Sequence, residues 1–110
     1  MARFIKGDVV VVTFPFSDLT QSKRRLALVI AELTGKDVIL CQITSQWIND
    51  EYAILIDDKD FDVGSLKQRS HIRPNRIFTA DSSIILYSVG QLKKKKIDDV
   101  IDKLIEILRN

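Results

Sequence analysis

The sequence has little of what metal sites, disulfides and phosphate-binding loops are built from. It holds one cysteine, Cys41, and one histidine, His71, so an internal disulfide is excluded and a zinc site of the usual kind is not expected. Its 4 glycines are isolated, and no glycine-rich phosphate loop is present. The aspartates between 57 and 62 lack the spacing of a calcium loop. We therefore expect neither a metal nor a cofactor.

Long apolar runs are also missing. No stretch approaches the roughly 20 apolar residues that a membrane-spanning helix requires, so we expect no membrane partner. The first residues, MARFIKGD, carry charge too early for the apolar stretch of a secretion signal. We expect a cytoplasmic protein in which residues 1–110 form a single domain, because this length suits one compact core.

Positive charge is clustered, although the net charge is only +2. One cluster covers residues 23–25, a second covers residues 67–76, and a third is the lysine run 93–96. Such clusters either bind nucleic acid or form a solvated face, and the sequence leaves both open. For the lysine run we favour a solvated helix start, although positive charge there opposes the helix dipole.

The pattern of apolar residues predicts strands followed by one helix. The predicted strands are 8–14, 26–32, 38–43, 52–56, 76–79 and 84–89, with a loop at 15–24 and an acidic turn after residue 56. Residues 65–69 fit either a strand end or an irregular segment. From Leu92 onward, apolar residues recur with the period of an amphipathic helix. The fold class is therefore α+β, with a curved, mostly antiparallel sheet and a C-terminal amphipathic helix.

Three segments, in order, resemble the MazF/PemK toxins, the mRNA interferases of type II toxin–antitoxin systems. The first is KGDVV at 6–10, continuing to FPFSDL at 14–19. The second, SKRRLALVI at 22–30, is similar to the family's SK-x-RPALVI, and the third is ITSQ at 43–46. Downstream, residues 77–81 and 85–92 look like the family's late segment before its closing helix.

This resemblance implies a small barrel-like sheet of the MazF/PemK/CcdB kind, usually found as a homodimer. It implies cleavage of single-stranded RNA without a metal. The neighbouring 2′-hydroxyl attacks the phosphate and leaves a cyclic phosphate and a 5′-hydroxyl. A cognate acidic antitoxin normally blocks the groove. The family's principal catalytic pair is the arginine that opens the second strand and the threonine that closes the third, which match Arg25 and Thr44 here.

The chemistry of these residue types fits that reaction. A guanidinium can hold two phosphate oxygens at once, but it is a poor base, so Arg25 is expected to stabilise charge or act as a general acid. Thr44 can donate a hydrogen bond to a phosphate oxygen or orient Arg25. The expected substrate-binding residues are Ser45, Gln46, Arg73, Arg76, Lys23 and Arg24.

The sequence departs from the family pattern, and its first loop lacks the histidine that some relatives carry. Leu26 replaces the proline that usually follows the arginine, and Asn75 stands where some members carry a carboxylate two residues after a late-strand arginine. The general base is therefore not identified. His71 is a candidate because imidazole exchanges protons near neutral pH, and the alternative is a structural role. Two other functions stay open, namely a topoisomerase poison of the CcdB type and a catalytically silent partner-binding relative.

Overall fold

The computed structural model describes residues 3–14 and 23–110. These residues form seven strands, two short 3-10 turns and one α-helix. The strands are β1 (Asp8–Phe14), β2 (Lys23–Glu32), β3 (Asp37–Thr44), β4 (Ile54–Ile56), β5 (Phe61–Gly64), β6 (Ser70–Asp81) and β7 (Ile85–Leu92). The helix is α1 (Lys94–Arg109) and the 3-10 turns are η1 (Asp58–Asp60) and η2 (Ser82–Ile84).

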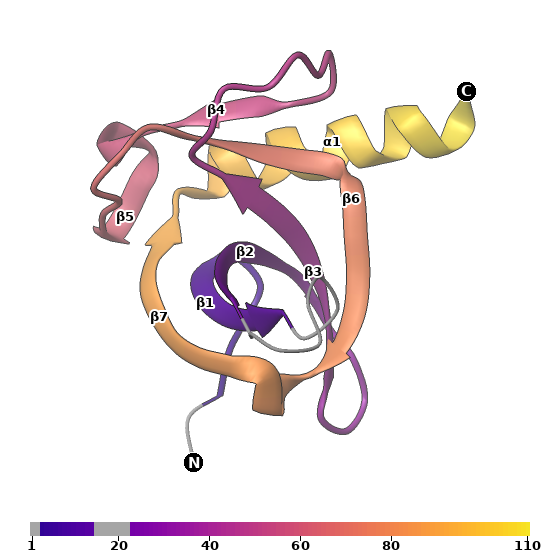
Figure 1. The fold of residues 1–110 in the computed structure, drawn as a ribbon. Helices are drawn as coiled ribbons and strands as arrows, with labels where there is room; N and C mark the ends of the chain where they lie inside the picture. Colours follow the sequence, from indigo (N-terminus) through magenta and orange to yellow (C-terminus); the bar gives the residue numbers. More distant parts are fainter. Residues whose placement is uncertain (1–2, 15–22) are drawn as a thin grey trace.

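All seven strands belong to one sheet in the order β4-β6-β3-β2-β1-β7-β5. Every neighbouring pair is antiparallel. The sheet is strongly curled, so that β6 and β7 arch on either side of the central strands while α1 lies across one end (Figure 1). The expected α+β class, with a curved antiparallel sheet and a C-terminal helix, is confirmed.

The sheet is buried on both faces, which explains why β1 reads as a nearly unbroken run of valines. The face that α1 covers holds one apolar cluster, and the opposite face holds another. The cluster under the helix includes Val9, Leu28, Ile30, Cys41, Ile43, Ile56, Phe61, Ile72, Leu92 and Val100. The cluster on the opposite face, which we call the inner face, consists of Val10, Val12, Ala27, Val29, Val38, Leu40 and Ile85.

The lysine run that starts α1 is partly engaged in contacts within the chain. Lys94 pairs with Asp98 one turn along the helix, at 2.8 Å. The Nζ atom of Lys96 lies 3.6 Å from a carboxylate oxygen of Asp60 and donates to the carbonyl of Leu55 at 3.3 Å. These contacts favour a structural role for both lysines. Within the described residues, no helix is long and apolar enough to cross a membrane.

Three segments differ from the sequence prediction. The acidic turn after residue 56 starts with the capping box of Asp57 and Asp60, ends at the extended residue Phe61, and is followed by a strand, β5. The predicted strand 76–79 is part of the much longer β6, whereas residues 65–69 are irregular. The predicted loop 15–24 is too long at its end, since β2 begins at Lys23, and residues 15–22 lie outside the described residues.

Two glycines with similar backbone conformations show how much steric overlap, beyond the cost of a positive φ, would destabilise this fold. Gly64 (φ 76°) and Gly35 (φ 84°) both have positive φ, but a Cβ at Gly64 would overlap the carbonyl of Val89 whereas Gly35 faces open space. We expect Gly64→Ala to lower the free energy of unfolding by at least about 3 kcal/mol and Gly35→Ala by about 1 kcal/mol. Urea denaturation measures both, and equal losses would contradict the packing of β5 against β7.

Candidate active site

Arg25 and Thr44, the two residues matched to the catalytic pair, are cross-strand neighbours. β2 and β3 pair Leu26 with Ile43, and continuing that register by one residue places Arg25 opposite Thr44. Directly opposed residues on antiparallel strands have Cβ atoms about 5 Å apart. Strand alternation puts both side chains on the inner face, in line with Ala27 and Leu40. Both are half-buried.

His71 lies directly on the other side of Thr44. β3 and β6 pair Thr44 with His71, and β4 and β6 pair Leu55 with His71. Arg25, Thr44 and His71 thus form one row across three strands, which we call the polar row. The Nδ1 atom of His71 is buried and has no hydrogen-bond partner within the described residues. The sequence left the role of His71 open, and the structure places it next to Thr44, with Arg25 on the far side of that residue.

The hydroxyl of Thr44 is oriented by the turn that ends β3. The backbone N–H of Gln46 donates to Thr44 Oγ1 at 3.2 Å. Because this contact uses the oxygen as an acceptor, the hydroxyl hydrogen remains able to donate to a substrate oxygen. Ser45 and Gln46 are both exposed directly beyond the row. Their predicted role in substrate binding stays a prediction.

A second row lies next to the first on the inner face. β3 and β6 pair Gln42 with Arg73, two residues along each strand from Thr44 and His71. Arg73 therefore faces the same side as the polar row. Its Nε donates to Asp50 Oδ2 at 3.1 Å, and the two side chains are only 20% and 8% exposed. The structure thus brings Arg73, one of the predicted substrate-binding residues, beside the predicted pair.

Asp50 is a site residue that the sequence analysis missed. Its Oδ1 accepts the backbone N–H of Tyr52 at 2.9 Å. Burial alone would raise the pKa of Asp50, but the hydrogen bonds from Tyr52 and from Arg73 outweigh it and hold the pKa below its ordinary value. The nearby side chain of Asn75 also helps to lower the pKa of Asp50. A carboxylate therefore does lie beside Asn75, but it comes from a distant segment that no motif marks.

A bulge in β6 directly follows Arg73 and determines the position of its backbone. The register shifts between Cys41, which faces Ile77, and Gln42, which faces Arg73, so residues 74–76 have no partner on β3. Pro74, which has no N–H to offer a ladder, suits this position. The Cys41 thiol donates to the carbonyl of Arg73 at 3.0 Å. Arg76 lies within the bulge and is exposed, and its predicted contact with substrate stays a prediction.

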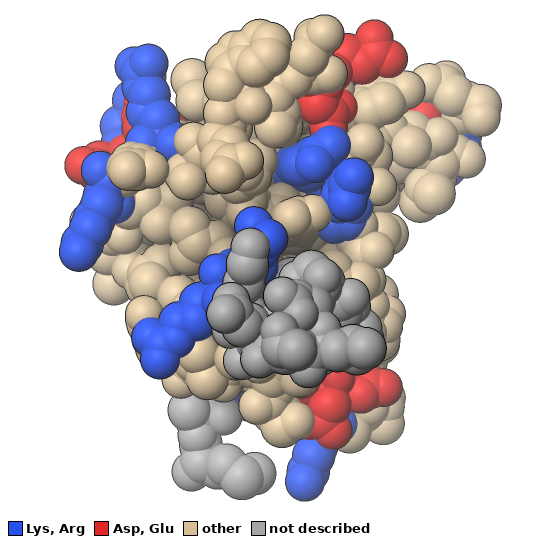
Figure 2. Space-filling model, in the orientation of Figure 1, with Lys and Arg blue, Asp and Glu red and all other residues tan. Residues whose placement is uncertain are grey.

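The remaining predicted basic residues lie at the start of β2. Arg24 is exposed and pairs with Thr13, so strand alternation turns it toward the face opposite Arg25. Lys23 pairs with Phe14, and its side chain lies outside the described part of the structure. Their roles in substrate binding remain predictions. Figure 2 shows several Lys and Arg side chains across the middle of one face of the molecule, with acidic side chains nearer its rim.

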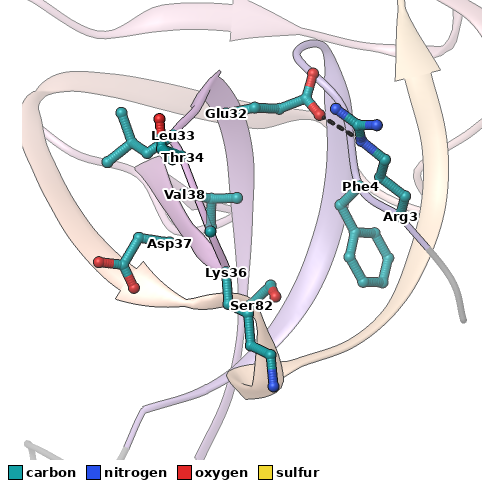
Figure 3. A pocket seen from close by; sticks show the side chains of 10 residues that line it. Arg3, Phe4, Glu32, Leu33, Thr34, Lys36, Asp37, Val38 and Ser82 are labelled. Carbon is teal, nitrogen blue, oxygen red and sulfur yellow. Dashed lines mark hydrogen bonds and ion pairs between the residues drawn. The ribbon is translucent and has the colours of Figure 1, made fainter.

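A cleft lies at the other end of β2 and β3. It has a volume of about 560 Å³ and is lined by residues of the hairpin turn together with Arg3, Phe4 and Ser82. Figure 3 shows the Arg3 guanidinium turned toward Glu32, to which its Nε donates at 3.0 Å. This cleft contains neither Arg25 nor Thr44 nor His71, and its arginine is already paired. The polar row is the better candidate for chemistry.

Family membership follows from the sequence as a whole. The family model of the PemK-like, MazF-like toxins of type II toxin–antitoxin systems matches residues 5–108. The chain belongs to this family. The resemblance based on the three segments is therefore confirmed. No curated protein sequence matches this MazF-like chain.

Solved structures of MazF proteins share this fold. MazF from Deinococcus radiodurans covers 100% of both chains with a TM-score of 0.79 at 17% identity. An endoribonuclease from a Mycobacterial species, solved in complex with its cognate antitoxin, has a TM-score of 0.76 at 11% identity and covers 97% of this chain and 96% of its own. The Mycobacterium tuberculosis toxin MazF-mt6 has a TM-score of 0.72 at 13% identity and covers 93% of this chain and 96% of its own. At these identities the likeness concerns the fold.

The Cys41 thiol is expected to be inert in the folded protein. Burial raises its pKa from 9.0 to about 12, which reduces the thiolate at pH 8 by roughly three orders of magnitude. A thiol-specific reagent should therefore label Cys41 rapidly in denaturant and very slowly under native conditions at pH 8. Labelling of the native protein at the rate of the unfolded chain would contradict the placement of Cys41 beneath the β6 bulge.

Proposed function

We propose that this MazF-like toxin is an endoribonuclease that cleaves single-stranded RNA, and mRNA in particular, without a metal. The observation that supports this proposal is the polar row, in which Arg25, Thr44 and His71 stand side by side on the inner face. RNA carries its own nucleophile, so the protein has only to position the 2′-hydroxyl, stabilise charge and transfer protons. A guanidinium, a hydroxyl and an imidazole together meet those needs.

Each member of the row has a separate task in this mechanism. The 2′-oxygen forms a bond to phosphorus while the bond from phosphorus to the 5′-oxygen breaks, which leaves a cyclic phosphate and a 5′-hydroxyl. Arg25 holds the non-bridging oxygens as negative charge grows on them, and it is placed to protonate the departing 5′-oxygen. Thr44, between the other two, donates its hydroxyl hydrogen to a non-bridging oxygen.

His71 accepts the proton that leaves the 2′-hydroxyl. Arg25 cannot do so, because a guanidinium is already protonated at ordinary pH and has no acceptor atom. The carboxylate of Asp50 is poorly suited as well, since both its oxygens already accept hydrogen bonds. His71 is the only imidazole of the chain and is the direct neighbour of Thr44 in the sheet. A neutral imidazole is the side chain best suited to accept a proton near neutral pH.

Single-stranded RNA is the expected substrate because the protein offers a surface for unstacked bases. Trp47 follows the exposed residues Ser45 and Gln46 and is itself 82% exposed. An exposed aromatic ring can stack on a base that a duplex would keep paired. Metal ligands are not needed for this reaction, and within the described residues no group of three or more His, Cys, Asp or Glu side chains could hold a metal.

The proposed partners follow from the same surface. Similar structures include MazE–MazF complexes from Deinococcus radiodurans. We propose that this protein likewise binds a cognate acidic antitoxin, because an acidic segment complements the guanidinium groups of Arg25 and Arg73 on the inner face. We also propose that it acts in the cytoplasm as a homodimer.

Alanine substitution of Arg25 or Thr44 should abolish most of the cleavage. Removal of one charge-stabilising donor typically lowers the catalytic rate about 100- to 1,000-fold, and we expect a loss of that size for Arg25→Ala and Thr44→Ala. The measurement is cleavage of a labelled single-stranded RNA in EDTA, with identification of the cyclic phosphate. Arg3→Ala is the matched control, because Arg3 is an exposed arginine at the remote cleft.

Retention of full cleavage by both variants would reject the assignment of these residues. If the wild-type protein leaves RNA intact but inhibits DNA supercoiling by a topoisomerase, the function is that of a CcdB-type poison. Binding of RNA without cleavage would identify a catalytically silent relative.

Replacement of His71 separates proton transfer from substrate binding. We expect His71→Gln to lower the rate of cleavage about 100-fold or more, because general base catalysis contributes that much, while the affinity for RNA changes little. The rate is measured under single-turnover conditions, and the affinity is measured with an oligonucleotide that has a 2′-deoxy sugar at the cleavage site. An unchanged rate would return His71 to a structural role.

A further inference from the structure

We propose that Asp50 is a positioning residue that holds the Arg73 guanidinium beside the polar row, so that its terminal nitrogens can bind the RNA phosphate. This inference rests on the proposed RNA cleavage. Neither residue belongs to the motifs at the ends of β2 and β3. The two come from segments 23 residues apart, and they meet on the inner face through a contact that no local sequence pattern requires.

The ion pair differs from the surface pairs of this protein in its burial. The Arg3–Glu32 and Lys94–Asp98 pairs have side chains that are between 32% and 88% exposed. The Arg73 and Asp50 side chains are 20% and 8% exposed. Surface pairs hold their geometry weakly, whereas breaking a desolvated pair leaves an uncompensated charge. The Arg73 guanidinium is therefore kept in one orientation.

Asp50 is itself fixed before it contacts Arg73. Its Oδ1 accepts the N–H of Tyr52, and its backbone carbonyl accepts the N–H of Ala53 at 3.1 Å. Arg73, which precedes the β6 bulge, donates to the other carboxylate oxygen at 3.1 Å. These contacts tie the segment before β4 to the bulge. A carboxylate held in this way serves as a rigid acceptor, and it leaves proton transfer to His71.

The bond to Asp50 fixes one edge of the Arg73 guanidinium and leaves its other N–H groups able to donate to a ligand. A guanidinium has five N–H donors, and Asp50 engages the one on Nε. Gln42 and the Cys41 thiol hold the backbone of Arg73 at the same time. Arg73 is more exposed than Asp50, so an incoming phosphate reaches the guanidinium before the carboxylate. Because the side chain is already ordered, less conformational freedom is lost when phosphate binds.

The position of Arg73 suggests which phosphate it contacts. It lies two residues from His71 along β6, a distance of about 7 Å on a strand. Adjacent phosphates in single-stranded RNA are separated by a similar distance. Arg73 is thus placed to hold a phosphate neighbouring the scissile one while Arg25 holds the scissile phosphate itself. Loss of Asp50 should then weaken substrate binding more than it slows the chemical step.

A double-mutant cycle tests whether Asp50 acts through Arg73. We expect Asp50→Asn and Asp50→Ala each to raise KM for RNA about 10-fold or more, with a smaller change in kcat. Arg73→Ala should have at least as large an effect, and Asp50→Ala in the Arg73→Ala background should add nothing. Lys96→Met is the control, because it breaks a comparably buried ion pair, with Asp60, and a bond to the Leu55 carbonyl, while leaving Asp50 and Arg73 unchanged. It should leave KM unchanged.

Three results would overturn the inference while RNA cleavage by the wild-type protein stands. The first is a KM unchanged in both Asp50 variants, with the fold verified by circular dichroism. The second is a further loss when Asp50→Ala is added to Arg73→Ala, since Asp50 would then act independently. The third is an equal rise in KM for Lys96→Met, which would indicate a general structural effect. Absence of cleavage by the wild-type protein is a different result, because it removes the proposed function itself.

A second readout reports the contact without RNA. In the wild-type protein the Arg73 Nε–H should give a resolved NMR signal that exchanges slowly with water, because a buried carboxylate accepts its hydrogen bond. In Asp50→Asn the exchange should accelerate at least 10-fold, while the Lys96→Met protein keeps the slow signal. Rapid exchange of the Arg73 Nε–H in the wild-type protein would overturn the inference, whatever the kinetics.

Discussion

The register between β2, β3 and β6 is the constraint on which the candidate site depends. Antiparallel pairing brings Arg25, Thr44 and His71, which are far apart in the sequence, into one row. A slip of one residue would turn every side chain of a strand to the other face. The apolar residues that continue each strand inward prevent such a slip, because Val29 and Leu40 are fully buried on the same face. The core therefore sets the geometry of the polar row.

The bulge in β6 is the second feature on which the site depends. It separates the part of the strand that packs in the core from the part that carries polar groups. On one side of the bulge, Phe78 and Ala80 pack against the inner cluster. On the other side, His71 and Arg73 face the same way but lie beyond the apolar residues. The buried pair of Asp50 with Arg73 and the thiol of Cys41 stabilise this change of register. The charged group of Arg73 thus lies at the edge of the core and is paired with Asp50.

Much of the fold was predictable because its signals are local. The valine run predicted a strand buried on both faces, and the periodic apolar residues after Leu92 predicted the helix. Arg25 and Thr44 were identified by their motifs, and their adjacency follows once β2 and β3 pair. β5 was missed because its few residues follow an acidic turn whose composition is that of a loop.

The rest of the site depends on contacts between distant segments. The neighbour of His71 could not be predicted, because β6 was recognised only from residue 76 onward. Asp50 carried no signal at all, since its role requires both the bulge and the segment before β4. In the sequence, Asn75 indicates only that the carboxylate of some family members is missing. In the structure, Asp50 supplies a carboxylate beside Asn75 from elsewhere in the chain.

The most direct test of the polar row is an NMR titration with a single-stranded oligonucleotide that has a 2′-deoxy sugar at the cleavage site. We predict that the Thr44 methyl, the His71 ring and the Arg73 side chain show the largest shifts, at a common affinity. The cleft lined by Arg3 and Glu32 serves as the internal reference and should stay unchanged. Shifts confined to that cleft or to the surface of α1, with none in the polar row, would contradict the account.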